Sequence, residues 1–153
     1  MKPRILVSMC LLGVNCRYDG GGKAMKGIAE LMELAELVPV CPETLGGLPI
    51  PRVPSERVGD RVLAKDGGDV TANFVRGAKE SLKLAKLFGA RRVLLKERSP
   101  SCGSGEIYDG SFSGALVPGD GVTAELLKKN GLAVYGESQI WELIDILKGE
   151  IER

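Results

Sequence analysis

The sequence predicts a single α/β domain with a mostly parallel sheet. Short apolar runs rich in Ile, Leu and Val alternate along the chain with longer segments whose apolar residues recur at helical spacing. This alternation is typical of a parallel sheet with helices on both faces. No internal repeat, low-complexity tract or linker divides the 153 residues, and a chain of this length can bury a substantial core. We therefore expect residues 1–153 to form one Rossmann-like, three-layer α/β/α domain.

Four short apolar runs are predicted as strands. They are Arg4–Met9, Val38–Cys41, Arg91–Glu97 and Leu132–Gly136. Doubly wound sheets of the 2-1-3-4 kind place the first strand between the second and the third. We expect that order here because it goes with the fold class.

Four other segments have the apolar spacing of amphipathic helices. They are Lys26–Leu37, Val70–Gly89, Val122–Gly131 and Ser138–Gly149. Gly89 is typical of the residue that follows a helix, and Ser138 is typical of an N-cap. The prolines of "PETLGGLPIPRVPSE" predict a stiff loop without regular structure, and the D-G pair in "RVLAKDGGDVT" predicts a small hairpin or strand.

Composition excludes several classes of function. The 21 Lys and Arg residues against 20 Asp and Glu give a net charge of +1, so no global field draws the chain to nucleic acid or to a membrane. No apolar stretch approaches the roughly 20 residues of a membrane span, and we expect a cytoplasmic protein. The chain has no histidine, which excludes Ser-His-Asp and Cys-His nucleophiles and any His-ligated metal. Acid–base chemistry therefore falls to carboxylates, Lys, Tyr, Cys or water.

Three of the four cysteines follow predicted strands. Cys10 ends the first strand, Cys41 ends the second, and Cys102 lies a few residues beyond the third, in the Ser- and Gly-rich stretch "KERSPSCGSGEIYDGSFSG". Parallel sheets bind ligands outside the carboxyl ends of their strands, and neighbouring strands are about 4.8 Å apart. The three sulfurs can therefore meet around one small object.

Cysteine thiolates without histidine point to iron–sulfur chemistry, in which four thiolates normally hold a cluster. Three thiolates on a four-iron cluster would leave one iron open for an exogenous ligand. The alternative is that Cys10 and Cys41 are small core residues and that Cys102 is incidental. Cys16, six residues after Cys10, is either a fourth ligand that closes the cluster or a bystander.

Polar residues surround these cysteines. The loop "NCRYDGGGK" offers Arg17 and Tyr18 beside a glycine run whose backbone N–H groups can approach a polar ligand, or it is a solvated turn. Glu43 follows Cys41 by two residues and is either a general acid or base or a partner for Arg52. Ser99 and Ser101 precede Cys102 and either contact a ligand or cap the turn, which is the ordinary role of such serines.

Three stretches together carry a resemblance to a known family. "SMCLLGVNCRYDGGGK", "VPVCPETLGGLPIPR" and "KERSPSCGSGEIYDG" resemble the thiouracil desulfidases, in the same order and over essentially the whole chain. The resemblance implies a [4Fe-4S] cluster on Cys10, Cys41 and Cys102, whose remaining iron takes the sulfur of a thiolated uracil. It implies a catalytic acidic residue at Glu43 and a catalytic serine at Ser99 or Ser101. It makes Cys16 a bystander.

The implied reaction converts thiouracil and water into uracil and hydrosulfide, with water activated by Glu43. Arg17, Tyr18 and Lys96 are the candidates for holding the pyrimidine. We expect a small thiolated pyrimidine as substrate, and thiolated RNA stays open as an alternative. The oligomeric state also stays open. Two alternatives remain: a sulfur-transfer enzyme with the same open cluster, and a non-catalytic iron–sulfur or metal-binding module with four cysteine ligands. Gly103 directly follows Cys102, and we expect a side chain there to crowd the cluster.

Overall fold

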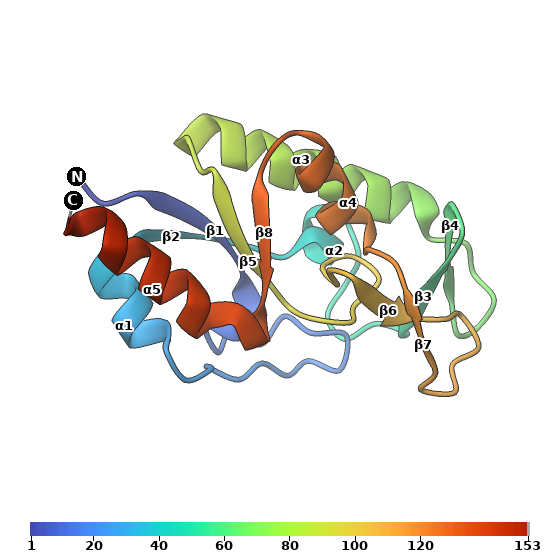
Figure 1. The fold of residues 1–153 in the computed structure, drawn as a ribbon. Coiled ribbons are helices and arrows are strands. Elements are labelled where there is room, and N and C mark those ends of the chain that lie inside the picture. Colours follow the sequence, from blue (N-terminus) through green and yellow to red (C-terminus); the bar gives the residue numbers. More distant parts are fainter. Residues whose placement is uncertain (153) are drawn as a thin grey trace.

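The main sheet has four parallel strands, as the sequence predicts. A computed structural model describes residues 1–152. The strands are β1 (Arg4–Ser8), β2 (Glu36–Val40), β5 (Arg92–Leu95) and β8 (Ala133–Gly136), and they lie in the order β2-β1-β5-β8 (Figure 1). This is the expected 2-1-3-4 order. The carboxyl ends of β2, β1 and β5 therefore lie next to one another at one edge of the sheet.

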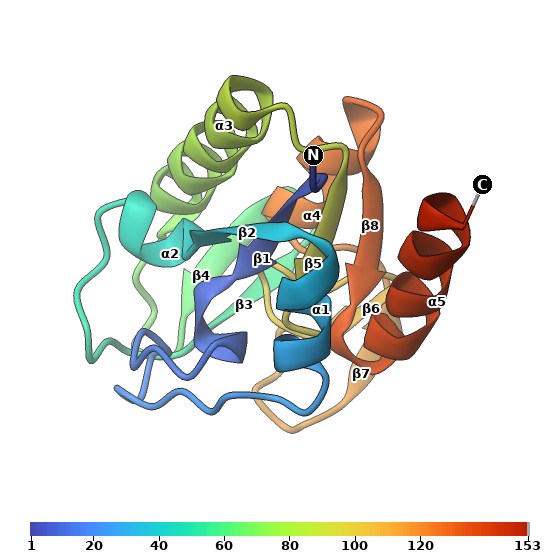
Figure 2. The same ribbon diagram turned by 90° about the vertical axis from the view of Figure 1, so that its left-hand side faces the viewer.

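Helices cover both faces of this sheet (Figure 2). Helices α1 (Ile28–Leu34) and α5 (Ile140–Ile151) cover one face, and α3 (Thr71–Phe88) and α4 (Val122–Lys129) cover the other. None of the helices in the described residues is long and apolar enough to cross a membrane. The three-layer α/β/α architecture is thus confirmed.

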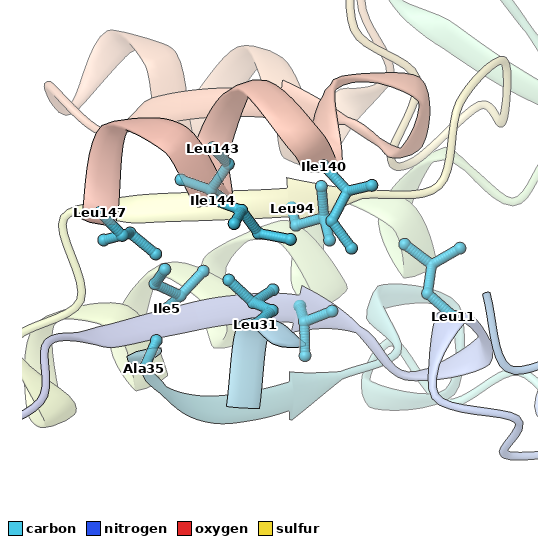
Figure 3. Close-up of a cluster of buried hydrophobic side chains, with 10 residues drawn as sticks. Ile5, Leu11, Leu31, Ala35, Leu94, Ile140, Leu143, Ile144 and Leu147 are labelled. Carbon is cyan, nitrogen blue, oxygen red and sulfur yellow. The ribbon is translucent and has the colours of Figure 1, made fainter. Parts of the chain in front are cut away.

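Alternation along the central strand divides the core into two clusters. Ile5 and Val7 of β1 join Leu31 of α1 and Leu143 of α5 on one face, as Figure 3 shows for most of this cluster. Leu6 lies in the second cluster, under α3 and α4. Because successive side chains of a strand point to opposite faces, a short apolar strand can serve both layers at once.

Smaller elements extend the carboxyl edge of the sheet. They are the 3-10 turns η1 (Met9–Leu11) and η2 (Glu137–Gln139), the one-turn helix α2 (Pro42–Leu45), and the strands β3 (Ser55–Val58), β4 (Arg61–Ala64), β6 (Glu106–Tyr108) and β7 (Leu116–Pro118). Strands β3 and β4 form one antiparallel hairpin, and β6 and β7 form another. The Ser- and Gly-rich composition around β6 hides this second hairpin from sequence analysis.

Several predicted boundaries are wrong, each for a local reason. Helix α1 ends at Leu34 rather than at Leu37, because Glu36 and Leu37 pair with β1 in the sheet. The proline-rich segment is not wholly irregular. Pro42 begins α2, where its missing N–H costs nothing, and residues 55–56 enter β3.

Two turns also differ from expectation. Ser138 does not cap the last helix; it lies in η2 and its hydroxyl donates to Glu97, while α5 begins at Ile140. The D-G pair does form a tight turn, in which the Ala64 N–H donates to the Gly68 carbonyl at 2.7 Å. The strand that pairs with β4 along its length is β3, not the segment that follows this turn. Gly89 follows α3 with φ = 69°, the left-handed conformation expected of it.

Candidate active site

A cavity with a volume of about 450 Å³ opens at the carboxyl ends of β1, β2 and β5. Each of these strands delivers one cysteine to its wall. Cys10 lies in η1, directly after β1, and Cys41 is the residue before α2, directly after β2. Cys102 lies in the turn that follows β5. The convergence expected from the strand order is therefore present.

The thiols of these three cysteines are close enough to affect one another. Burial raises the pKa of Cys10, and Cys41 raises it further. Burial also raises the pKa of Cys102 to about 12, with smaller contributions from Glu43 and Cys10, against hydrogen bonds from Ser8 and Ser101 that lower it. Thiols that would repel one another as thiolates suit a cationic metal centre, which favours deprotonated sulfur.

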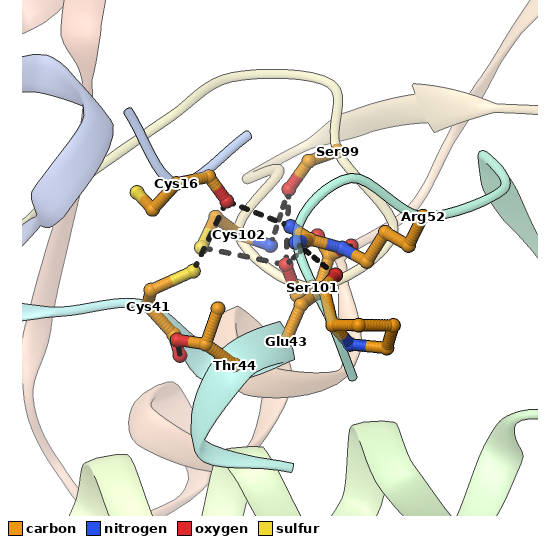
Figure 4. Close-up of polar contacts among 9 residues, drawn as sticks. Cys16, Cys41, Glu43, Thr44, Arg52, Ser99, Ser101 and Cys102 are labelled. Atoms are coloured by element: carbon orange, nitrogen blue, oxygen red, sulfur yellow. Dashed lines mark hydrogen bonds and ion pairs between the residues drawn. The ribbon is translucent and has the colours of Figure 1, made fainter. Parts of the chain in front are cut away.

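Cys16 borders the same cavity and is buried, with 3% of its surface exposed. Its carbonyl oxygen accepts hydrogen bonds from the Cys41 thiol at 3.7 Å and from the Arg52 guanidinium at 3.0 Å (Figure 4). Burial, followed by the neighbouring Cys41, raises the pKa of the Cys16 thiol to about 12. The backbone carbonyl of Cys16 therefore helps to position the Cys41 and Arg52 side chains in the site.

Glu43 is held on both carboxylate oxygens. Arg52 donates to Oε1 at 3.0 Å, and the Ser101 hydroxyl donates to Oε2 at 3.1 Å. The Arg52 side chain is only 6% exposed and also reaches the Pro49 carbonyl at 3.2 Å. Both readings of Glu43 from the sequence thus describe the same residue: it pairs with Arg52 and it faces the cavity.

The two serines before Cys102 form a chain of hydrogen bonds that ends at Glu43. The Cys102 N–H donates to Ser99 Oγ at 2.7 Å, and the two serine hydroxyls lie 3.3 Å apart. Because the Ser101 hydroxyl has one proton, donation to Glu43 leaves its oxygen free to accept the Ser99 proton. Ser101 can otherwise turn that proton to the Cys102 sulfur, 3.6 Å away. Ser101 is thus placed between a carboxylate and a thiol.

Comparison with known proteins decides the family. A model of the family described as 2-thiouracil desulfurase matches residues 5–139. The chain belongs to that family. It is similar to the uncharacterized protein YbbK of Bacillus subtilis (strain 168), with 45% identity over 153 residues that cover 94% of this chain and 99% of YbbK. It is also similar to the solved structure of the [4Fe-4S]-dependent thiouracil desulfidase TudS, with a TM-score of 0.91 and 46% identity over 96% of this chain and 99% of that one.

The cysteines around the cavity suit a [4Fe-4S] cluster, the cofactor on which TudS depends. Within residues 1–152, no three His, Cys, Asp or Glu side chains are grouped to hold a single metal ion. A four-iron cluster makes a different demand, because each cysteine binds a different iron and the ligand sulfurs stand further apart. Three thiols around one cavity and a chain without imidazole fit that demand.

The residues predicted to hold the pyrimidine all line the same cavity. Lys96 donates to Glu137 at 2.6 Å, and Arg17 lies 3.8 Å from Asp19. Tyr18 is 42% exposed. The structure brings these three side chains to the site, and their contact with substrate stays a prediction.

At Gly103 the structure shows a steric limit inside the chain itself, and crowding of the cluster stays a prediction. A Cβ at Gly103 would meet the Ser99 carbonyl oxygen and the Ile107 side chain, each at 2.8 Å. These atoms belong to the turn and to β6, so the glycine permits a close approach within the chain.

Sequence reasoning missed several further residues on the cavity wall, among them Glu56, Tyr108 and Phe112. These three come from β3, from β6 and from the loop after β6. Only the glycines on either side of Phe112 hinted at a defined turn, and nothing in the sequence linked that turn to β3.

Proposed function

We propose that this chain is a [4Fe-4S]-dependent thiouracil desulfidase whose cluster is held by Cys10, Cys41 and Cys102. The observation that carries the proposal is the meeting of these thiols with Glu43 and Ser101 around one cavity, in a chain of the 2-thiouracil desulfurase family. The overall reaction is thiouracil plus water to uracil plus hydrosulfide.

When bound, the cluster supplies an iron without a cysteine ligand, which acts as a Lewis acid toward the thiocarbonyl sulfur. The chain supplies the proton acceptor. Glu43 takes a proton from the attacking water, whose oxygen bonds to the carbon as the carbon–sulfur bond breaks. The second proton of the water passes from oxygen to sulfur, so the carbon–oxygen double bond of uracil forms and sulfur leaves as hydrosulfide. The proton on Glu43 returns to solvent.

Arg52 and Ser101 act on Glu43 rather than on the substrate. Arg52 fixes Oε1, so the carboxylate cannot rotate away from the cavity. Ser101, itself only 1% exposed, holds Oε2 and directs the carboxylate toward water that enters beside the substrate. Fixed orientation of a base is worth a large part of its catalytic effect.

The substrate we propose is a small thiolated pyrimidine, held in the cavity that Arg17 and Tyr18 line. The four free thiols also favour an enzyme that works in the reducing cytoplasm. Thiolated RNA is the competing substrate, and it enters the experiment as a separate assay.

The test uses anaerobically reconstituted protein. We expect four irons and four sulfides per chain, and sulfide release from 2-thiouracil that exceeds release from a short thiolated RNA. Replacement of Cys10, Cys41 or Cys102 by Ser should each remove the stable cluster, whereas Cys16→Ser, the matched control, should keep it.

Two results would contradict this proposal in different ways. A fully loaded protein that releases no sulfide from 2-thiouracil refutes the activity. Loss of iron in the Cys16→Ser variant refutes the three-cysteine ligand set and favours a closed, four-cysteine cluster.

A further inference from the structure

The loop between β6 and β7 contributes an aromatic ring to the cavity. Phe112 lies in this loop, partly buried, and lines the same cavity as the three cysteines. Tyr108, the last residue of β6, lines it as well. The Asp109 N–H donates to the Ala115 carbonyl at 3.0 Å and closes the base of the loop.

The side chain of Glu56 in β3 forms hydrogen bonds with the backbone of this loop. One carboxylate oxygen, Oε1, accepts hydrogen bonds from the Gly110 N–H at 2.9 Å and from the Phe112 N–H at 3.1 Å. Glu56 is only 9% exposed. Burying a carboxylate is costly unless its bonds are made, and here two backbone N–H groups make them. The chain thus uses a buried carboxylate to fix the loop between β6 and β7.

The backbone of Phe112 is itself strained. Its φ is 56°, in the left-handed region that residues other than glycine rarely adopt. Such a conformation persists only where surrounding contacts over-determine it, and these positions gather at functional sites. The Glu56 hydrogen bond to the Phe112 N–H is such a contact. Strain and anchor together set the direction in which the ring leaves the loop.

We propose that Phe112 is the stacking surface for the pyrimidine ring and that Glu56 is its positioning residue. This inference rests on the proposed function and specifies how its substrate is held. A planar pyrimidine gains affinity from an aromatic face that excludes water. The Phe112 ring orients the thiolated carbon toward the side of the cavity that carries the three cysteines, and the ring itself does not react. Phe112 therefore affects substrate binding more than the chemical step.

The first test compares steady-state constants of the loaded enzyme for 2-thiouracil. Phe112→Ala should raise KM roughly 5- to 100-fold, the range of a lost base–aromatic stack, while kcat changes little. Phe112→Tyr should restore the wild-type KM because it keeps the ring. Ser113→Ala, an exposed change in the same loop, is the matched control and should behave as wild type.

A second test reads the anchor without catalysis. Glu56→Ala should speed hydrogen exchange at the Gly110 and Phe112 amides in the iron-free chain, whereas Glu56→Gln, which keeps an oxygen acceptor, should preserve their protection. Glu56→Ala should also raise KM, and adding it to Phe112→Ala should raise KM no further. The thermal midpoint of each iron-free variant shows that the fold is kept.

The outcomes separate the inference from the function it rests on. An unchanged KM in Phe112→Ala overturns the stacking role while leaving the desulfidase intact. Equilibrium dialysis of uracil against loaded protein tests the same site even if no sulfide is released: binding weakened by Phe112→Ala supports it, and equal or absent binding overturns it. Unaltered amide exchange in Glu56→Ala overturns the anchor.

Discussion

Glu43 is fixed from two sides, by a residue nine positions ahead in the chain and by one 58 positions ahead. Arg52 supplies a charge that opposes the carboxylate, and Ser101 supplies a hydroxyl whose one proton can reach either Glu43 or Cys102. Such a charge-assisted pair in a mostly buried position holds geometry better than an exposed pair. The orientation of the Glu43 carboxylate is therefore fixed by its two hydrogen bonds.

Replacing Glu43 by Gln tests this carboxylate. Gln keeps the shape and an oxygen for Arg52 but removes the proton acceptor, so sulfide release should fall by about 10²–10⁴. Iron content should stay at the wild-type value, and the thermal midpoint should fall, because Gln leaves the charge of the mostly buried Arg52 without its opposite charge. Glu33→Gln, an exposed change on α1, is the control. Activity of Glu43→Gln within a few-fold of wild type would demote Glu43 to a structural residue.

Gly103→Val tests whether the glycine after Cys102 serves the turn. The new side chain would press on the Ser99 carbonyl and on Ile107, so the iron-free chain should lose about 1–3 kcal/mol of unfolding free energy. Iron content should fall with it, since the turn carries Cys102. Gly149→Val, in open space on α5, should do neither. Lost iron with an unchanged unfolding free energy would favour direct crowding of the cluster as the cause.

Among the elements, the one-turn helix α2 does most to place the site. Cys41 immediately precedes it and Glu43 lies in its first turn. Helix α2 sits against α3, where the Asn73 amide donates to the Gly46 carbonyl at 2.8 Å and Gly77 lies under the Pro42 carbonyl. A helix this short has little stability of its own. Its position is therefore set by α3.

Gly77→Ala should displace α2. In most helices this substitution stabilises by up to about 1 kcal/mol, but here the added Cβ would overlap the Pro42 carbonyl. We expect a lower thermal midpoint, less iron and slower sulfide release. Gly149→Ala is the matched control, because nothing lies within 4 Å of its Cβ, and it should stabilise slightly. A Gly77→Ala protein with wild-type iron and activity would show that α2 is not held by this contact.

The pair between Arg57 of β3 and Glu125 of α4 makes stability depend on pH. Their hydrogen bond, 2.7 Å long, lowers the pKa of Glu125. Its contribution is therefore present above the unfolded pKa of about 4.3 and is lost as pH falls through the lower folded value. With the Glu125 side chain 38% exposed, Glu125→Gln should cost less than about 1 kcal/mol at pH 7.

Urea unfolding of wild type and Glu125→Gln at a series of pH values measures this effect. The difference in unfolding free energy should shrink toward zero in acid, where both side chains are neutral. Glu33→Gln again serves as the control. A difference that is constant from pH 7 into acid would mean that Arg57 gains nothing from the charge of Glu125.

For the whole molecule, most core residues are not proposed ligands of the iron–sulfur cluster. Two apolar clusters hold the sheet between its helices, and of the three proposed ligands Cys102 alone belongs to the buried residues of either. The proposed ligands themselves lie 31 and 61 residues apart along the chain, as 41 − 10 and 102 − 41 give. A cluster that joins such distant segments binds the folded chain far better than the unfolded one.

Removing the iron should therefore lower stability without unfolding the protein. The iron-free chain should keep its far-ultraviolet circular dichroism and a cooperative transition. Loading should raise Tm by about 2–4 °C for each kcal/mol of stabilisation in a domain of this size. Cys102→Ser is the control and should have the same Tm before and after reconstitution. An iron-free wild type without a transition would mean that the cluster is needed for folding.

The sequence by itself determined the layers, and the strand order that goes with this fold class then predicted that Cys10, Cys41 and Cys102 meet where the strands end. These depend on local periodicity and on general rules of parallel sheets, which act over short stretches of chain. Short-range reasoning failed where two periods compete, as at Leu37, which fits a helix but pairs in β2, and at Pro42, which begins a helix. The roles of the site residues remain predictions.

Only the tertiary structure decided which loops touch. That Ser101 would reach Glu43, and that Glu56 would hold the backbone on either side of Ser111, depends on contacts between segments more than 50 residues apart. No periodicity encodes such contacts, because loops follow no repeating geometry and take their positions from the elements they pack against. The thiols meet because strands end together; the carboxylates find their partners because the loops above those ends are packed.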